Sequence, residues 1–153
     1  MVIMTKSVEI VQRLHDSHWL GVLVITGGGS QALSRLLSQS GASRTVLEAR
    51  VPYAAAALAD FLGNTPDQAC SNQTARSMAM AAFVRAQQLA GRTHSPVLFG
   101  LGVSAALATD RVRKGLDRAF ICIQTLSHTW EFNLSLDPKR TEAQGNRAHQ
   151  EEW

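Results

Sequence analysis

Apolar residues recur along the first part of the chain at two different spacings. In residues 7–18 they follow the helical period, with polar side chains on the opposite face, which predicts an amphipathic helix. Residues 20–25 form a continuous β-branched and apolar run, typical of a strand buried on both faces. Residues 26–30 then form a glycine loop, and a helical stripe that ends at Gly41 follows. Together they predict a strand, a loop and a helix in succession.

The rest of the chain continues this alternation. Pro52 and Gly63 bracket a predicted helix, and Ser71 is placed to cap the start of a long one. Gly100 and Gly102 mark the expected end of a third strand. The predicted elements after residue 41 are, in order, a strand at 45–51, helices at 53–62 and 71–91, strands at 96–101, 119–125 and 129–136, and a polar helix at 140–153.

This order of elements predicts an α/β fold. Two strands separated by a short turn are expected to close the sheet as an antiparallel hairpin. We expect a three-layer α/β/α sandwich whose mixed, mostly parallel sheet has helices on both faces, folded as a single domain of residues 1–153. The aromatic residues of the last strand, Trp130 and Phe132, are expected in the core.

Composition narrows the class of protein. The 153 residues are 45% apolar and 18% charged, which excludes a disordered chain. The longest apolar stretch, residues 97–108, is interrupted by Gly and Ser and is shorter than the about 18 residues that a membrane span needs. Residues 1–19 mix charges among their apolar positions and lack the apolar region of a secretory signal. We therefore expect a cytoplasmic protein without a membrane partner.

Charges and ligand-type side chains exclude further classes. The net charge is +3 and the arginines are spread from Arg13 to Arg147, so no nucleic-acid partner is expected. Cys70 and Cys122 lie far apart without neighbouring histidines, a pattern that fits neither a disulfide framework nor a zinc site. His15 and His18 are expected to form a surface pair. No metal or other cofactor is predicted.

The glycine loop at residues 26–30 is the first candidate for a ligand site. In an open α/β sheet, ligands bind beyond the carboxyl ends of the strands, where a helix amino terminus presents N–H groups and a positive dipole. Gly27, Gly28 and Gly29 permit close backbone approach, and the hydroxyls of Thr26 and Ser30 add donors for a phosphate or carboxylate. The alternative is a tight turn without a ligand, because the loop matches neither the Walker A nor the Rossmann pattern.

A second candidate follows the predicted third strand. Gly100 and Gly102 lead into a segment with Arg111 and Lys114, whose charges suit a phosphate unless the segment is simply a solvated loop. If both glycine segments top neighbouring strands, they converge on one crevice. Two further side chains are candidates for this crevice, those of Tyr53 and Arg140.

The order and spacing of several short motifs resemble one known family. The motifs are Thr26-Gly27-Gly28, Gly41-Ala42-Ser43, Val51-Pro52-Tyr53, Leu62-Gly63, Ser71 with Met78-Ala79, and Gly100-Leu101-Gly102. Over roughly residues 7–140 the chain resembles the CinA carboxyl-terminal domain, the nicotinamide-nucleotide amidohydrolase family. The resemblance implies a three-layer α/β/α domain, a homo-oligomer and a final helix longer than residues 140–153. It also implies hydrolysis of the carboxamide of nicotinamide mononucleotide by a serine nucleophile and a lysine base, without a metal.

Two positions depart from the family pattern. The family's nucleophilic serine lies two residues before the loop threonine, where this chain has Val24. Its lysine lies five residues after the tyrosine, where this chain has Leu58. Neither side chain can perform nucleophilic or basic chemistry. The resemblance retains the positions that hold the ligand, which are Thr26, Gly27, Gly28, Tyr53, Ser71, Gly100 and Arg140.

Three hypotheses follow. The first is a CinA-like domain that binds a phosphorylated ligand, a pyridine nucleotide, with deamidase activity weak or absent. The second is an active amidohydrolase with relocated catalytic groups, Ser30 and Lys114. The third is a non-catalytic assembly module whose Ala-rich helix, residues 53–62, packs against another subunit. The residues predicted to bind the ligand are Thr26, Gly27, Gly28, Gly29, Ser30, Tyr53, Gly100, Gly102, Arg111 and Arg140.

Overall fold

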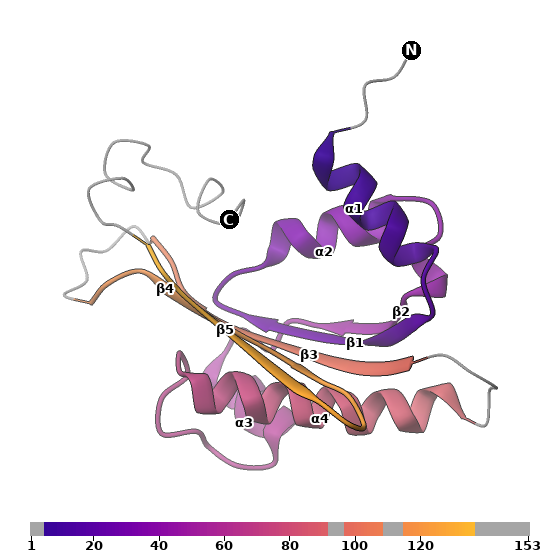
Figure 1. Ribbon diagram of the computed structural model, residues 1–153. Coiled ribbons are helices and arrows are strands. Elements are labelled where there is room, and N and C mark those ends of the chain that lie inside the picture. The colour runs from indigo at the N-terminus through magenta and orange to yellow at the C-terminus, as the bar shows by residue number, and fades with distance from the viewer. Residues whose placement is uncertain (1–4, 92–96, 109–114, 137–153) are drawn as a thin grey trace.

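The computed structural model describes residues 5–91, 97–108 and 115–136. A five-stranded sheet lies between two layers of helices, α1 and α2 over one face and α3 and α4 over the other (Figure 1). The helices are α1 (Lys6–His15), α2 (Ser30–Ser38), α3 (Ala55–Leu62) and α4 (Asn72–Ala90), with a short 3-10 helix, η1, at Ala42–Arg44. The strands are β1 (Trp19–Thr26), β2 (Val46–Arg50), β3 (Val97–Ala106), β4 (Arg118–Gln124) and β5 (Thr129–Ser135). The predicted α/β/α sandwich is confirmed, and the helix predicted at 140–153 lies outside the described residues.

The strands are ordered β2-β1-β3-β4-β5 across the sheet. β1 is parallel to both β2 and β3, whereas β4 is antiparallel to β3 and to β5. Four strands therefore run in one direction and β4 runs against them, which confirms a mixed, mostly parallel sheet. The predicted hairpin is β4–β5, and β3–β4 is a second antiparallel pairing that the sequence does not indicate.

The two faces of β1 explain its continuous apolar sequence. Val22 and Val24 pack in the cluster between the sheet and the α3/α4 layer. Leu23 and Ile25 belong to a second cluster on the α1/α2 face, with Leu33 of α2. All four of these β1 side chains are at most 3% exposed, so the strand is buried on both faces, as predicted.

β3 is longer than the sequence predicts. It continues to Ala106, so Gly100 and Gly102 lie within the strand, and the prediction that they end it is wrong. Both glycines face α4. A Cβ atom added at Gly100 would overlap backbone atoms of Ala79 and Phe83, and one added at Gly102 would lie 2.6 Å from the backbone nitrogen of Ala79. The two glycines are therefore explained by the close approach of a helix backbone to the strand.

α4 begins as the sequence predicts. The Ser71 side chain accepts a hydrogen bond from the backbone N–H of Thr74 at 3.1 Å, which satisfies one of the donors left unpaired in the first turn. Its buried face is rich in alanine, which lets the helix lie close to β3 and β4. None of the described helices is long and apolar enough to cross a membrane.

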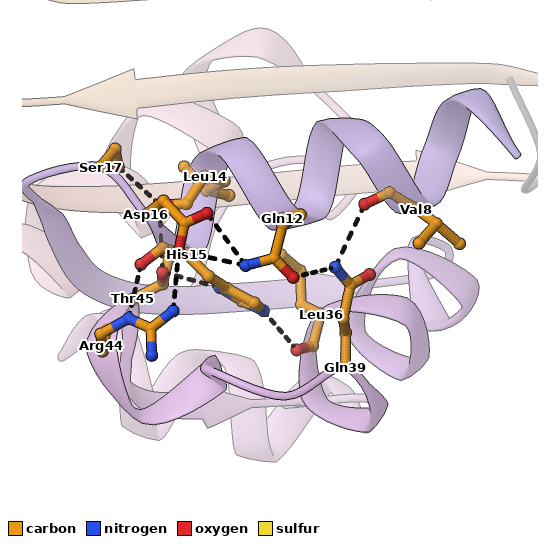
Figure 2. A network of polar contacts seen from close by, with 10 residues as sticks. All are labelled: Val8, Gln12, Leu14, His15, Asp16, Ser17, Leu36, Gln39, Arg44 and Thr45. Carbon is orange, nitrogen blue, oxygen red and sulfur yellow. Dashed lines mark hydrogen bonds and ion pairs between the residues drawn. The ribbon is translucent and has the colours of Figure 1, made fainter. Parts of the chain in front are cut away.

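A buried histidine attaches α1 to the rest of the domain (Figure 2). His15 is fully buried, with its Nδ1 2.8 Å from Thr45 Oγ1 and its Nε2 3.0 Å from the carbonyl oxygen of Leu36. The prediction of a surface pair with His18 is wrong, because only His18 is exposed. Since the carbonyl can only accept, Nε2 carries a proton and donates it to Leu36, while Nδ1 shares a hydrogen bond with the Thr45 hydroxyl.

The same network reaches the surface beside His15. The Arg44 guanidinium donates to the carbonyl oxygen of His15 and to the Asp16 carboxylate, at 2.9 Å in each case. Hydrogen bonds from Gln12 and Arg44 hold the pKa of the exposed Asp16 carboxyl below its usual value. These contacts join the end of α1 to η1, two segments that are far apart in the sequence.

An ion pair joins β2 to α4 and gives stability a pH dependence. Glu48 Oε2 lies 3.0 Å from Arg85 Nε, and Glu48 Oε1 lies 3.2 Å from Arg50 Nη2. Hydrogen bonds from Arg85 and then from Arg50 lower the pKa of the Glu48 carboxyl below 4.5. A carboxyl with a lowered pKa in the folded state stabilises the protein above its unfolded pKa, and this contribution disappears as the pH falls through the folded pKa.

We expect Glu48→Gln to lower the free energy of unfolding at pH 7 by less than about 1 kcal/mol, because the pair is partly exposed. The difference from the wild type should shrink as the pH falls from 5 towards the acid limit of folding, since protonation of Glu48 removes the same charge. Urea denaturation at a series of pH values measures it. Asp60→Asn, on the exposed surface of α3, is the control. A difference that stays constant down to the lowest pH would contradict the assignment.

Candidate functional site

The carboxyl ends of β1, β2 and β3 lie at one edge of the sheet, because these strands are parallel. The chain leaves β1 through α2 towards β2 on one side, and returns through α3 and α4 to β3 on the other. The order of the strands therefore reverses between β1 and β3, which is where open α/β sheets bind ligands. Thr26, the last residue of β1, lies there opposite Ser104 of β3.

The predicted glycine loop follows Thr26 at this edge and leads into α2. Gly29 is the N-cap of α2, with a φ of 94°, and no side chain caps the helix at that position. Gly27 also has a positive φ, of 76°, and a Cβ atom there would overlap the backbone of Ala105. A Cβ atom at Gly28 would lie 2.8 Å from the Leu107 side chain. The loop thus packs closely against the end of β3, which accounts for two glycines in structural terms.

A second loop reaches the same edge from the α3/α4 face. Ser104 is fully buried, and its hydroxyl donates to the carbonyl oxygen of Ala69. The Cys70 thiol lies 3.8 Å from the backbone oxygen of Ser104. Ser71, which the family resemblance includes among the ligand positions, has its hydroxyl engaged in capping α4. The hydroxyls of Ser104 and Ser71 therefore serve the structure of the edge.

Other predicted site residues lie in different places. Tyr53 follows β2 at the same edge with its side chain 66% exposed, and Ser30 is the exposed first residue of α2. Gly100 and Gly102 lie inside β3 against α4 and do not reach the loop. Three of the predicted basic residues fall outside the described residues, namely Arg111, Lys114 and Arg140.

The two positions that depart from the family pattern lie together in the core. Val24 and Leu58 are 0% and 2% exposed and belong to one apolar cluster with Met78 of α4. Their side chains fill the space between the sheet and the α3/α4 layer. This cluster provides neither a nucleophile nor a base.

The cysteines and acidic residues offer no alternative centre within the described part of the chain. There, no group of three or more His, Cys, Asp or Glu side chains is arranged to hold a metal ion. Cys122 is buried against α4, and burial raises the pKa of its thiol, which keeps the sulfur protonated at neutral pH.

Two hollows lie away from the glycine loop. The larger, of about 430 Å³, is apolar and lies on the α1/α2 face of the sheet, with Leu14 and Leu36 on one side and Trp130 and Phe132 on the other. The smaller, of about 300 Å³, is lined mainly by polar side chains of the loop between α3 and α4 and of the first turns of α4. Trp130 and Phe132, which line the larger hollow, are residues that the sequence predicted to lie in the core.

These features define a three-layer open α/β domain with a glycine loop where the strand order of its sheet reverses. Solved structures of the CinA superfamily share this fold. A competence/damage inducible protein from Agrobacterium tumefaciens is 20% identical, with a TM-score of 0.67 over 93% of this chain and 89% of that one. A CinA superfamily protein from Klebsiella pneumoniae is 13% identical, with a TM-score of 0.67 over 94% of this chain and 92% of that one. One from Escherichia coli is 14% identical, with a TM-score of 0.64 over 89% and 82% of the two chains.

At these identities the similarity shows the fold, which is CinA-like. No family model matches the sequence, and no curated protein matches it.

Proposed function

We propose that this chain is a CinA-like domain that binds a phosphorylated ligand, a pyridine nucleotide, and that the amide hydrolysis of the family it resembles is weak or absent. The packing of Val24 and Leu58 carries the proposal. These are the positions at which the resemblance implies a serine and a lysine, and both are occupied by apolar side chains with almost no exposure. Covalent hydrolysis needs a nucleophile and a base at that place.

The proposed binding of a phosphorylated ligand is supported by the elements next to the glycine loop. The loop leads into the amino terminus of α2, whose dipole favours an anion. Arg111 belongs to the connection between β3 and β4, and the described ends of that connection lie at the carboxyl edge. Ser135, at the end of β5, pairs with Arg118 at this same edge, and Arg140 follows it in sequence. Arg111 and Arg140 thus belong to segments whose described ends lie at the same edge of the sheet as the glycine loop.

An active hydrolase with relocated groups is the second candidate, because Ser30 is exposed at the start of α2 beside the loop. In that case Lys114, from the connection after β3, would act as its base.

A thermal-shift titration of the full chain with nicotinamide mononucleotide, nicotinate mononucleotide, NAD and inorganic phosphate tests binding. A mononucleotide at 100 times its dissociation constant is expected to stabilise the native state by about 2.7 kcal/mol, and phosphate at the same concentration by much less. Arg111→Ala and Arg140→Ala should reduce the shift, and Arg13→Ala, on the exposed face of α1, should leave it unchanged. The absence of a shift with all four compounds would reject the ligand and favour an assembly module.

Ammonia release from nicotinamide mononucleotide tests whether the chain hydrolyses the carboxamide. We expect no release above the rate without protein. Steady turnover that Ser30→Ala or Lys114→Ala abolishes, and that Lys6→Ala preserves, would instead establish the relocated hydrolase.

A further inference from the structure

β5 forms one outer edge of the sheet (Figure 1). Within the described part of the chain, no strand pairs with its outer side, and all seven of its residues are exposed. The strand contains no proline or lysine, and its pairing with β4 runs without a bulge. Proline, lysine and bulges are the usual means by which proteins prevent an edge strand from pairing with another chain. β5 therefore has the properties of a strand that pairs.

The backbone groups that face outward can be assigned from the ladder with β4. The N–H of Leu136 donates to the carbonyl oxygen of Asp117, and the N–H of Thr125 donates to that of His128. Backbone groups alternate in direction along an antiparallel ladder. The even-numbered residues of β5 therefore face β4, and four residues direct their N–H and C=O groups to the free edge, namely Thr129, Glu131, Asn133 and Ser135.

The apolar side chains of β5 are also incompletely covered. Trp130, Phe132 and Leu134 are 39%, 51% and 37% exposed, and they lie on the α1/α2 face next to Ile123, Ile121 and Ala119 of β4. The prediction that Trp130 and Phe132 are core residues is wrong, because both are partly exposed and line the hollow that they share with Leu14 of α1 and Leu36 of α2. Trp130 packs edge-on against Trp19, with ring centroids 6.3 Å apart, and the other two side chains extend the apolar row outward.

We propose that β5 pairs antiparallel with β5 of a second copy of this chain, about a two-fold axis that passes through Phe132. This register pairs the backbone N–H and C=O groups that face the free edge. Glu131 forms a hydrogen-bonded pair with the partner subunit's Asn133, and Thr129 with the partner subunit's Ser135. The two-fold axis repeats each pair. Phe132 meets the partner subunit's Phe132 at a non-hydrogen-bonded position, where side chains are closest. Trp130 meets the partner subunit's Leu134. All seven residues of the strand are paired.

Charge selects this register over a neighbouring one. An axis through Glu131 would place two carboxylates directly opposite each other, which is unfavourable across strands. An axis through Phe132 places each Glu131 opposite a neutral Asn133. Glu131 is already paired with Arg76 at 2.8 Å on the α4 face, so the partner subunit needs to supply no cation.

A second copy fits this edge better than the segment of the chain that directly follows β5. Residues 137–153 contain a single large apolar side chain, Trp153, and cannot supply a row to match Trp130, Phe132 and Leu134. Residues 54–57, at the start of the Ala-rich segment, are exposed alanines, and their small side chains offer less apolar area for an interface.

Sedimentation of the full chain at a series of concentrations tests the assembly. We expect a dimer. Asn133→Glu should raise the dissociation constant of the dimer about tenfold, because it places a carboxylate opposite Glu131 at two symmetric positions. Asn133→Lys should lower the dissociation constant or leave it unchanged. The two variants change the same exposed residue and are matched controls for folding. A chain that is monomeric at every concentration, or an equal effect of the two variants, would overturn the proposal.

Disulfide trapping tests the register separately. In a Cys70→Ser background, Phe132→Cys should give a covalent dimer on mild oxidation, since the paired Cα atoms would lie about 4.5 Å apart, within disulfide range. Trp130→Cys should not, because it lies opposite Leu134. Cross-linking of both variants, or of neither, would exclude this register.

Discussion

Alanine at Gly100 or Gly102 is expected to lower the free energy of unfolding by about 3 kcal/mol for each substitution, the upper end of the range for overpacking a core. At Gly100 the new Cβ atom overlaps backbone atoms of Ala79 and Phe83, and at Gly102 it lies 2.6 Å from the backbone nitrogen of Ala79. A helix backbone cannot move away as a flexible side chain can. The whole of α4 must therefore shift, which loosens its contacts with β1, β3 and β4 at once.

Urea denaturation followed by circular dichroism measures this loss. Gly115→Ala is the matched control, because a Cβ atom there meets nothing within 4 Å, and its effect should stay within about 0.5 kcal/mol. The double variant should lose less than the sum of the two single losses, since the first substitution already displaces the helix. If alanine at Gly100 is as well tolerated as alanine at Gly115, the close packing of α4 on β3 is not what requires glycine.

The same two glycines show where prediction from sequence fails in this fold. A strand under a closely packed helix has small residues at every second position, and in a single sequence this resembles the glycine-rich end of a strand. β1 was predictable, because a strand buried on both faces needs a continuous apolar run, and Leu23 and Val24 satisfy both faces. β5 was placed correctly, but its sequence does not reveal that a hollow, lined by Leu14, Leu36 and Phe132, is left on the α1/α2 face of the sheet.

The sequence predicted where the candidate site lies better than it predicted which residues are available to bind a ligand there. The glycine loop after β1 lies at the edge where the strand order reverses, as the strand and helix pattern implies. The contributions of Arg111 and Arg140 stay predictions. The distinction between a ligand-binding hydroxyl and a structural one depends on tertiary contacts: the Ser71 hydroxyl caps α4, and that of Ser104 bonds to Ala69.

The CinA-like fold has apolar side chains, Val24 and Leu58, at the two positions where the family resemblance implies a serine and a lysine. A serine or a lysine at the positions of Val24 and Leu58 would be a polar or charged group inside what is here a closed apolar cluster, and burying such groups without partners destabilises the folded state. Two apolar side chains there add to the packing between the sheet and α3. The cluster therefore stabilises the domain at the position where the family resemblance implies catalysis.

His15→Ala is expected to lower the free energy of unfolding by about 3 kcal/mol, because it leaves a cavity and removes the partner of the Leu36 carbonyl oxygen and of the Thr45 hydroxyl. His18→Ala, at an exposed position in the bend between α1 and β1, should change it by less than about 0.5 kcal/mol. Thr45→Val keeps the shape of a residue that is 1% exposed and removes only its hydroxyl.

A double-mutant cycle over His15 and Thr45, measured by urea denaturation at pH 7, isolates their contact. We expect a coupling free energy of about 1 kcal/mol, since the 2.8 Å hydrogen bond is buried. Thr45 also lies 3.4 Å from the carbonyl oxygen of Leu14, so the hydroxyl has a poorer alternative acceptor once the ring is gone. Strictly additive losses would mean that His15 stabilises the attachment of α1 by filling space, and that its hydrogen bond to Thr45 contributes nothing.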